Sequence, residues 1–371
     1  MVKCLVTKLN ASIEDNSILR LGEARFKRVS NSNAGVSNQA FSINTNKSTK
    51  IEIIGDGYFT DKTLSQNLGK YMILNAGEYK SIYTSQGDYE IAVLDKYAIT
   101  NLYSGSRESV NFNTEKNCIY INLDNLAFTS NITDFRVSSL YGKVDNLKRN
   151  TGITHLMLGL NQNITGDLAM VAGFQSLEQL YLNNDNISCN LSYLNDLVNI
   201  KTLLLRSKQV KGDLSLLSKL KKIESLDFYN SAISGNVSSL SGLTKIKELI
   251  LYGNKITGDI SSLSSLSNLS RLELRHTQTT GDLATLSDEL CYFRSNSSYS
   301  WSSRSSSANI ISIEEAKFEN VDKMLQNQAQ CTVPSSVLNK IISVKGARTS
   351  ASDSAVQTLQ SKGYTVSITP A

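Results

Sequence analysis

Apolar residues recur along the middle of the chain in one arrangement, apolar-x-x-apolar-x-apolar. The last two apolar positions of each set alternate with positions expected to be exposed, which predicts a short strand that points every second side chain inward. The sets are Ile153, Leu156 and Leu158; Leu177, Leu180 and Leu182; Ile200, Leu203 and Leu205; Ile223, Leu226 and Phe228; Ile246, Leu249 and Leu251; and Leu269, Leu272 and Leu274.

A second motif follows these strands, with the consensus Ile-x-Gly-Asp-Leu. Its copies are Leu140–Val144, Ile164–Leu168, Ile187–Leu191, Val210–Leu214, Ile233–Val237, Ile256–Ile260 and Thr279–Leu283. The third residue of the motif advances by 24 residues once and by 23 five times. A fixed period of this length indicates stacked supersecondary units. Such stacks present an extended surface and not a catalytic pocket.

After each motif, apolar residues recur at every third position, as at Leu214, Leu217 and Leu220. This period predicts a tight 3₁₀-like or extended turn on the outer side of each coil. The central glycine permits a positive φ where the chain turns. The acidic residue of the motif recurs at Asp167, Asp213, Asp259 and Asp282. It could belong to a calcium ladder, but its periodicity favours capping of backbone N–H groups in the turn.

The combined pattern, Leu-x-x-Leu-x-Leu-x-x-x-x-Ile-x-Gly-Asp-Leu-x-x-Leu-x-x-Leu, resembles the leucine-rich repeat family, in its variant with a Gly-x-Ile step. The resemblance covers about residues 132–290 and implies a solenoid with its strands on the concave face. Two features depart from the family pattern. The proline usual after the glycine step is missing, and the usual asparagine after the strand is replaced by Asp185, Lys208, Ser231 or Thr277.

The expected fold class is mixed α and β, mainly β. Residues 1–39 are predicted to form an N-terminal arm, and residues 40–128 a β-sandwich-like domain made of many short strands separated by turns. Residues 129–290 are predicted to form the leucine-rich-repeat solenoid of about seven 23-residue repeats, beginning with an irregular one. Residues 291–371 are predicted to form a Ser-rich loop and a small α/β C-terminal cap.

Within this last segment, the Ser-rich stretch 295–307 has two interpretations. It is a polar loop that replaces one repeat's turn, or it is an exposed contact loop, because Tyr299, Trp301 and Arg304 are residue types common at binding hot spots. Ser312–Glu315 has the form of a capping box and predicts a helix. The pattern further predicts a strand at Ile341–Val344, a helix at Ala351–Lys362 and a final strand at Thr365–Ile368.

Composition and charge limit the possible partners. The chain has 371 residues, a formal net charge of +5 spread thinly, and no stretch of 18 apolar residues. We therefore expect no nucleic-acid partner and no membrane insertion. The five cysteines are far apart, which argues against a disulfide framework or a zinc site. Cys189 takes the glycine position of its repeat and is expected to be packed and unreactive. No secretory signal is evident at the N-terminus.

No constellation for catalysis is present in the sequence. The only histidines are His155 and His276, at non-equivalent repeat positions, so neither a metal site nor a Ser-His-Asp triad is predicted. Gly55–Gly57 is too short for a phosphate loop and predicts a hairpin turn. We expect no enzyme activity, no cofactor and no metal.

The strand residues that point away from the core form the candidate binding site on the concave face. Tyrosine and arginine are favoured at interfaces, whereas the alternative is an ordinary solvated face whose charges pair across strands. The candidate residues are Tyr181, Arg206, Asp227, Tyr229, Glu248, Tyr252, Arg271, Glu273 and Arg275.

The segments Leu5–Glu23 and Ala351–Val366 look similar to the two ends of structural proteins of tailed phages of gut bacteria. This second resemblance implies a non-enzymatic virion protein, a tail or head appendage made in the host cytoplasm. Its N-terminal region would contact other virion proteins, and its repeats a protein or a surface glycan. The alternatives are a bacterial cell-surface or secreted adhesin and an intracellular interaction scaffold. The sequence leaves open whether the chain forms a homo-oligomer.

Overall fold

The computed structural model describes residues 24–28, 39–46, 48–55, 59–61, 66–69, 71–77, 79–83, 89–93, 99–103, 119–126, 129–137, 140–158, 163–302, 312–331 and 340–370. Contacts divide the chain into two compact units, Met1–Thr165 (unit 1) and Gly166–Ala371 (unit 2). Each unit is described by itself.

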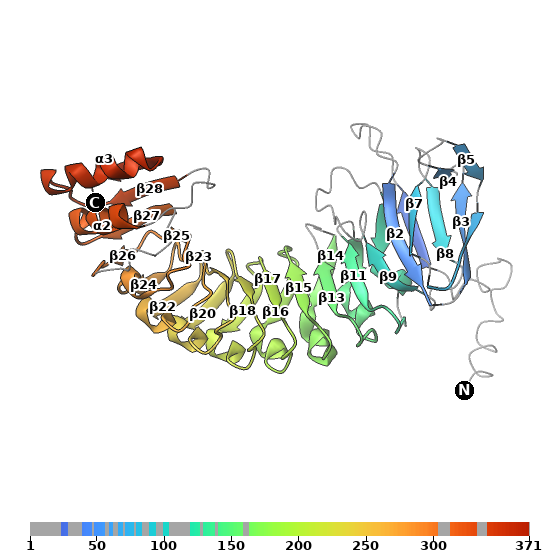
Figure 1. Cartoon of the computed structure of the whole chain (residues 1–371). Helices are drawn as coiled ribbons and strands as arrows, with labels where there is room; N and C mark the ends of the chain where they lie inside the picture. Colours follow the sequence, from blue (N-terminus) through green and yellow to red (C-terminus); the bar gives the residue numbers. More distant parts are fainter. Residues whose placement is uncertain are drawn as a thin grey trace. The chain divides into compact units, whose positions relative to one another are not determined.

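The predicted strands of the repeats form one parallel sheet in unit 2 (Figure 1). Each strand pairs with the strand of the next repeat without a register shift, as expected for identical units stacked in sequence. The strands are β15 (Gln179–Leu182), β17 (Thr202–Leu205), β19 (Ser225–Asp227), β21 (Glu248–Ile250) and β23 (Arg271–Glu273).

The Ile-x-Gly-Asp motifs form a second parallel sheet in the same unit. Its strands are β16 (Ile187–Asn190), β18 (Val210–Asp213), β20 (Ala232–Asn236), β22 (Lys255–Asp259) and β24 (Gln278–Thr280), and β14 (Ile164–Asp167) spans the boundary between the units. The predicted tight turns follow as 3₁₀ helices. They are η6 (Leu168–Gly173), η7 (Leu191–Leu194), η8 (Leu214–Leu217), η9 (Val237–Leu240), η10 (Ile260–Leu263) and η11 (Leu283–Thr285).

The 3₁₀ helices η6 to η11 all have the same N-terminal cap, whereas Lys143, before the 3₁₀ helix of the first motif copy, makes no side-chain cap. The Asp or Asn before the helix accepts a hydrogen bond of 2.7–3.0 Å from the backbone N–H two residues further on. The side chain thus satisfies one of the N–H groups that a helix start leaves unpaired. The prediction that the recurring acidic residues cap backbone N–H groups of the turns is confirmed. The capping residues are Asp167, Asn190, Asp213, Asn236, Asp259 and Asp282.

The core of the repeats is made of the apolar positions that recur in the sequence. In one repeat, Leu203, Leu205, Leu214 and Leu217 are all 0% exposed. Near the strand ends, a polar side chain that differs between repeats satisfies the backbone: Asn254 accepts from the Ile233 N–H at 3.0 Å, and serine or threonine acts in other repeats. The Ser231 hydroxyl donates to the Leu205 carbonyl oxygen at 2.7 Å, and that of Thr277 to the Leu274 carbonyl oxygen at 2.7 Å.

The C-terminal part of unit 2 continues the strand sheet as β25–β27–β28–β29 in parallel. The elements are β25 (Tyr292–Arg294), β26 (Ser298–Tyr299), β27 (Ser312–Phe318), α2 (Val321–Gln330), β28 (Lys340–Lys345), η12 (Ser350–Ser352), α3 (Asp353–Ser361) and β29 (Tyr364–Thr369). The predicted last helix and last two strands are confirmed.

The helix predicted to begin at the capping box of Ser312 is present, with Val321, Met324 and Leu325 buried, but the predicted start is wrong. Residues 312–318 form β27, which pairs with both β25 and β28. Ile313 and Ala316 are buried in the core that these strands share, so pairing on both sides outweighs the local helix signal. The helix starts later, at Val321, where the Asn320 side chain accepts from the Lys323 N–H at 2.8 Å.

Unit 1 contains short strands that pair antiparallel in three sets, β10–β1–β8–β3–β6, β9–β2–β7 and β4–β5. They are β1 (Ala24–Arg28), β2 (Gln39–Thr45), β3 (Thr49–Gly55), β4 (Phe59–Asp61), β5 (Gln66–Gly69), β6 (Tyr71–Leu74), β7 (Tyr79–Tyr83), β8 (Tyr89–Val93), β9 (Ile99–Tyr103) and β10 (Ile119–Asn122). The β-sandwich remains a prediction.

The first coils of the repeat region also lie in unit 1, where β10 and β9 continue in parallel into β12 and β11. The elements are η4 (Leu123–Leu126), β11 (Asp134–Val137), β12 (Leu140–Lys143), η5 (Val144–Leu147) and β13 (His155–Leu158). Most of the predicted N-terminal arm and the turn at Gly55–Gly57 lie outside the described residues.

Candidate binding surface

The register of the strand sheet determines which predicted residues share a row. We call the outward side of β15, β17, β19, β21, β23 and β25 the strand face. Its first row is Gln179, Thr202, Ser225, Glu248, Arg271 and Tyr292, and its second row is Tyr181, Leu204, Asp227, Ile250, Glu273 and Arg294. Just past the strand ends, a third row holds Arg206, Tyr229, Tyr252 and Arg275, spaced by 23 residues.

The third row consists of arginine and tyrosine, and we call it the Arg-Tyr ladder; Tyr229, Tyr252 and Arg275 stack on one another in it. The rings of Tyr229 and Tyr252 stack with centroids 4.3 Å apart and planes 11° apart. The guanidinium carbon of Arg275 lies 4.5 Å from the centroid of the Tyr252 ring, within the range of a cation–π contact. The His276 ring meets Tyr252 edge-on at 5.2 Å. Equivalent positions of successive repeats therefore form one contact surface.

Arg206, at one end of the ladder, is held by a buried carboxylate. Its Nε donates to Asp227 Oδ2 at 2.9 Å, and its Nη2 donates to the same oxygen. The Asp227 side chain is 3% exposed, whereas that of Arg206 is 38% exposed. The hydrogen bond to Asp227 raises the pKa of Arg206 despite the opposing effect of burial. A partner at this end would meet the guanidinium, with its counter-charge underneath.

Arg275, at the other end, has the same arrangement with Glu273. The Arg275 Nε donates to Glu273 Oε1 at 2.9 Å. Arg271 also approaches Glu273, but its Nη2 stays 3.7 Å from Oε2. The Nε of Arg271 has no hydrogen-bond partner, and its guanidinium carbon lies 4.6 Å from the Tyr292 ring centroid. Arg271 is thus positioned by stacking and keeps unused donor capacity on a side chain that is 42% exposed.

The structure therefore separates the predicted residues into two kinds. Asp227 and Glu273 are buried and neutralise arginines from below, whereas Tyr229, Arg206, Arg271 and Glu248 are accessible. Charges pair on this face, as the solvated-face interpretation expects, and aromatic and arginine side chains remain accessible. That the face binds a partner stays a prediction. Tyr181 lies in the second row, beside Leu204.

The exposed contact loop is wrong for two of its three residues. Tyr299 is 1% exposed and Trp301 is 4% exposed, whereas Arg304 lies outside the described residues. The Tyr299 hydroxyl shares hydrogen bonds of 2.8 Å with the hydroxyls of Thr279 and Ser295. The Ser-rich segment up to residue 302 thus adds one more coil to the stack, because Ser300 bridges to Asp282 of the previous repeat.

Sequence reasoning missed the part of the strand face that lies beyond residue 290. Arg294, in β25, forms ion pairs with Glu314 at 3.4 Å and with Glu315. Burial opposes the charged form of Arg294, but the hydrogen bond to Glu315, the charge of Glu315 and the interactions with Tyr292 together raise its pKa. The hydrogen bond from Arg294 lowers the pKa of Glu315. The missed signal was Phe293, which takes the place of Leu272 in the next repeat. It is not a leucine, and its spacing from Leu272 is shorter than the regular 23 residues.

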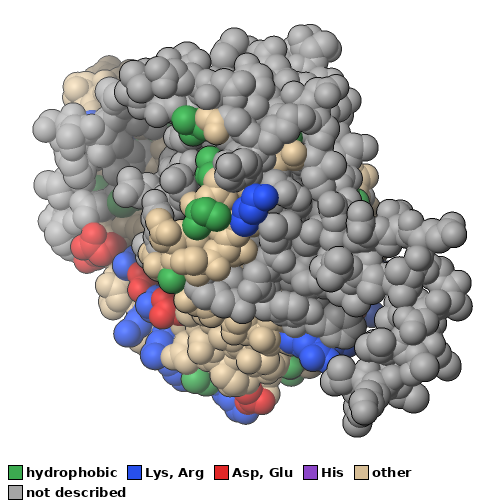
Figure 2. Space-filling view, turned by 90° about the vertical axis from the view of Figure 1, so that its right-hand side faces the viewer, with side chains coloured by type: hydrophobic (Ala, Val, Ile, Leu, Met, Phe, Trp, Pro, Cys, Tyr) green, Lys and Arg blue, Asp and Glu red, His purple; other side chains and the backbone are tan. Residues whose placement is uncertain are grey.

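The described residues contain no group of three or more His, Cys, Asp or Glu side chains arranged to hold a metal ion. None of the helices in the same described residues is long and apolar enough to cross a membrane. Figure 2 shows that described Lys and Arg side chains are interspersed with Asp and Glu along its lower edge. Cys189 is 1% exposed, and burial, followed by the nearby charge of Asp167, raises the pKa of its thiol to about 12.

Parallel strands at a 23-residue period, capped 3₁₀ turns and an inner stack of leucines define the architecture of the repeats. The fold is a leucine-rich-repeat solenoid. Listeria monocytogenes internalin C2 has a similar backbone, with 23% identity, 55% of this chain and 84% of that chain covered, and a TM-score of 0.42. A second internalin of that bacterium has 18% identity, 75% and 85% coverage, and a TM-score of 0.41.

A plant peptide hormone receptor is also similar, with 16% identity and a TM-score of 0.46 over 65% of this chain and 40% of that chain. This chain therefore spans less than half of the receptor's length. No protein-family model matches the sequence, and no curated protein matches it.

Proposed function

We propose that this chain is a non-enzymatic binding protein whose strand face takes a protein partner. The Arg-Tyr ladder is the observation that carries the proposal, because it gathers tyrosine and arginine from four successive repeats at one edge of the sheet. These are the residue types that dominate binding energy at protein interfaces. Adjacent strands lie about 4.8 Å apart, so the six strands of this face span roughly 25–30 Å, enough for a protein surface.

The geometry of the ladder favours a protein over a glycan. A sugar stacks on a free aromatic face, but Tyr252 has Tyr229 of the preceding repeat on one side and Arg275 of the following repeat on the other. What Tyr252 offers to a partner is its edge and its hydroxyl. Tyr229 is 40% exposed at the end of the stack. Ring edges, hydroxyls and guanidinium groups suit the mixed polar and apolar surface of a protein.

The setting of this binding role is a second proposal, and it rests on the terminal segments. Their similarity to structural proteins of tailed phages supports a virion appendage that attaches through its N-terminal region. A bacterial surface or secreted leucine-rich-repeat protein is compatible with the same fold. Mass spectrometry and immunogold microscopy of purified particles separate the two: label at one fixed place on the particle supports the virion, and label only on uninfected cell envelopes contradicts it.

The binding surface is tested by photo-crosslinking from defined positions. Benzoylphenylalanine replaces Tyr229 on the strand face in one variant, and exposed Lys219, beyond η8, in the matched control. Incubated with purified particles or with host cell envelopes, the Tyr229 variant is expected to yield one discrete crosslinked protein band, and the Lys219 variant none. A band from Lys219 alone would overturn the strand face as the binding surface. Free wild-type chain in excess should abolish the Tyr229 band.

A further inference from the structure

The last strand of unit 2 has an open edge. Among the strands that the structure describes, β29 pairs only with β28, in a parallel register that runs without a shift from Lys340↔Tyr364 to Lys345↔Thr369. Along the main path of this sheet, the earlier strands β17, β19, β21, β23, β25, β27 and β28 each have a neighbour on both sides, and β26, off this path, pairs with β27. The outer backbone groups of β29 are therefore available to another strand.

The apolar side chains of β29 are less buried than those of β28, as expected for a strand with a neighbour on one side only. Ile342 and Val344 of β28 are 0% and 1% exposed. Their register partners in β29 are Val366 and Ile368, which are only half-buried. The residue types are equivalent, so the difference comes from position: β28 is covered on both sides, and β29 is not. A further strand at this edge would bury Val366 and Ile368 as β29 buries Ile342 and Val344.

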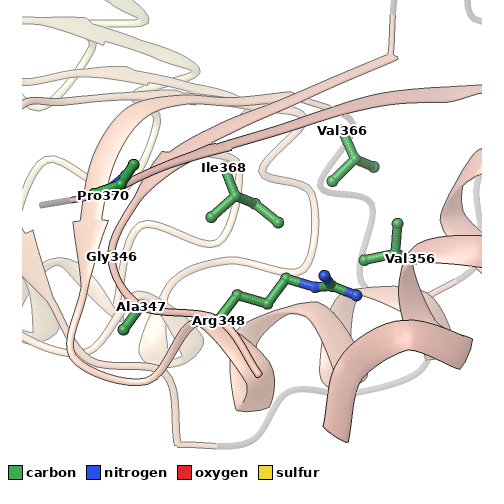
Figure 3. Close-up of a pocket in the computed structure, with 7 residues that line it drawn as sticks. All are labelled: Gly346, Ala347, Arg348, Val356, Val366, Ile368 and Pro370. Carbon is green, nitrogen blue, oxygen red and sulfur yellow. The ribbon is translucent and has the colours of Figure 1, made fainter. Parts of the chain in front are cut away.

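A groove lies beside this edge. Its volume is about 640 Å³, and its walls come from α3, from the segment after β28 and from β29. Figure 3 shows Val356, Val366, Ile368 and Arg348 around the hollow. Arg348, the charged residue of the lining, is paired with Asp353 and donates from Nε to the Ser352 hydroxyl at 3.1 Å. The groove is therefore apolar and locally neutral, and it does not select a charged partner.

The edge also lacks the features that normally prevent strands from pairing. Natural edge strands carry lysine, proline, bulges or inward-pointing charges. Residues 365–369 are Thr-Val-Ser-Ile-Thr, with no charge, no proline and high β propensity. Their register with β28 has no bulge. A regular, uncharged and open edge of this kind is suited to pairing.

We propose that β29 is a self-association strand, which pairs antiparallel with β29 of a second copy of this chain across a two-fold axis at Ser367. About this axis, Val366 lies opposite Ile368 of the other copy on the helix side, and Thr365 lies opposite Thr369 on the other side. Apolar side chains meet apolar ones, hydroxyls meet hydroxyls, and no like charges come together. A two-fold contact uses the same patch on both subunits, which this strand supplies.

The state of association tests the proposal. Sedimentation velocity of the full chain over a concentration series is expected to show a monomer–dimer equilibrium. Val366→Lys adds a charge at the edge and is expected to raise the dimer Kd about tenfold or more, because each dimer carries the change twice. Ser361→Lys adds the same charge at an exposed position of α3 outside the groove lining, and should leave the Kd unchanged.

Cysteine crosslinking tests the register. Directly opposite residues of antiparallel strands have Cα atoms about 4.5–5.5 Å apart, which a disulfide spans. Ser367→Cys should therefore form a covalent dimer under mild oxidation, reversible by reductant. Thr369→Cys should not, because the two copies of residue 369 would lie about 13 Å apart along the strands at 3.4 Å per residue. The wild type, with its native cysteines, gives the background.

Three results would overturn the inference. A chain that stays monomeric at all concentrations has no such contact. A dimer that Val366→Lys leaves intact uses another surface. A Thr369→Cys variant that crosslinks as well as Ser367→Cys has a different register. Because the readout is self-association, none of these results bears on the partner of the strand face.

Discussion

Gly235 lies directly against the capping carboxylate of Asp213 in the preceding repeat. A Cβ atom at residue 235 would come within 2.9 Å of Asp213 Oδ2 and within 3.0 Å of the Leu214 backbone nitrogen. Gly235 also has a φ of +120°, where side chains are strained. The glycine and the aspartate of the motif are therefore one device: the aspartate caps its own turn, and the next glycine leaves room for that cap.

Gly235→Ala is therefore expected to destabilise the repeats by about 2 kcal/mol or more, through backbone strain and the collision with the cap. Urea unfolding followed by circular dichroism measures the loss. Gly242→Ala is the matched control, because a Cβ there would meet only the mobile Lys221 Nζ. Equal destabilisation by both variants would show that steric coupling between repeats is not the cause.

The cap itself is tested at Asp213. Its Oδ1 accepts hydrogen bonds from the Ser215 N–H at 3.0 Å and the Ser215 hydroxyl at 2.7 Å. Asp213→Ala is expected to cost about 1 kcal/mol. Asp213→Asn should cost much less, because Asn236 makes the equivalent bond to the Ser238 N–H at 2.9 Å. If Asn and Ala are equally destabilising, the negative charge matters and the hydrogen bond does not.

Most of the solenoid could be predicted because its period carries the same signal many times over. A single weak pattern, such as leucine at every third position, becomes decisive when several repeats agree. The C-terminal part has no such redundancy. Ser312–Glu315 matches a helix cap locally, yet its residues form a strand between β25, which the sequence pattern did not predict, and β28, which it did.

The candidate site was predictable in its members but not in its chemistry. Strand alternation placed Arg206 and Asp227 on one face, and the structure adds that the arginine is open while the carboxylate is 3% exposed. This difference in exposure arises because the Arg206 side chain lies over the Asp227 carboxylate, and a sequence pattern does not show which side chain covers the other. Tyr299 and Trp301 were predicted to be exposed because the serines around them suggest a polar loop. The segment instead forms one more coil of the stack, in which both side chains are buried.

The Cys189 thiol is expected to resist alkylation in the native chain. Its pKa of about 12 leaves almost no thiolate at pH 8, and the side chain is 1% exposed. Iodoacetamide labelling read by mass spectrometry should modify Cys189 only after urea unfolding. Cys291, which is only partly buried, is the internal reference. Native labelling of Cys189 as fast as that of Cys291 would contradict the packed position.

Stability in acid should depend on Asp322. Its carboxylate accepts hydrogen bonds from the Ser352 hydroxyl at 2.5 Å, the Thr349 hydroxyl at 2.6 Å and the Thr349 N–H at 3.1 Å. The hydrogen bonds from Ser352 and Thr349 lower the pKa of Asp322. A carboxyl with a lowered folded-state pKa stabilises the fold above its unfolded pKa of about 4, and this stability is lost as pH falls through the folded pKa.

The comparison is made between urea midpoints at pH 7 and pH 3. Asp322→Asn should lower the midpoint at pH 7, and its difference from wild type should shrink as the pH falls and Asp322 takes up a proton in the folded state as well. Glu319→Gln, at an exposed position before α2, should leave both midpoints unchanged. If the urea midpoint of Asp322→Asn equals that of wild type at pH 7, the Asp322 carboxylate does not contribute to the pH dependence of stability.

Arg271 and Arg275 approach the same carboxylate, but truncating them should lower the stability of the fold by very different amounts. Arg275→Ala leaves Glu273, whose side chain is 6% exposed, with only the ion pair to Arg271 at 3.7 Å. Breaking one side of a buried pair costs about 3 kcal/mol or more. Arg271→Ala removes a longer contact from a side chain that is 42% exposed, so its cost should stay below about 1 kcal/mol. Urea unfolding of the two variants side by side measures the difference, and equal losses would contradict the assignment of Glu273 to Arg275.

Because Arg271→Ala should keep the fold, a binding defect in that variant would report on the strand face itself. The same defect in Arg275→Ala would also contain the cost of an unpaired carboxylate.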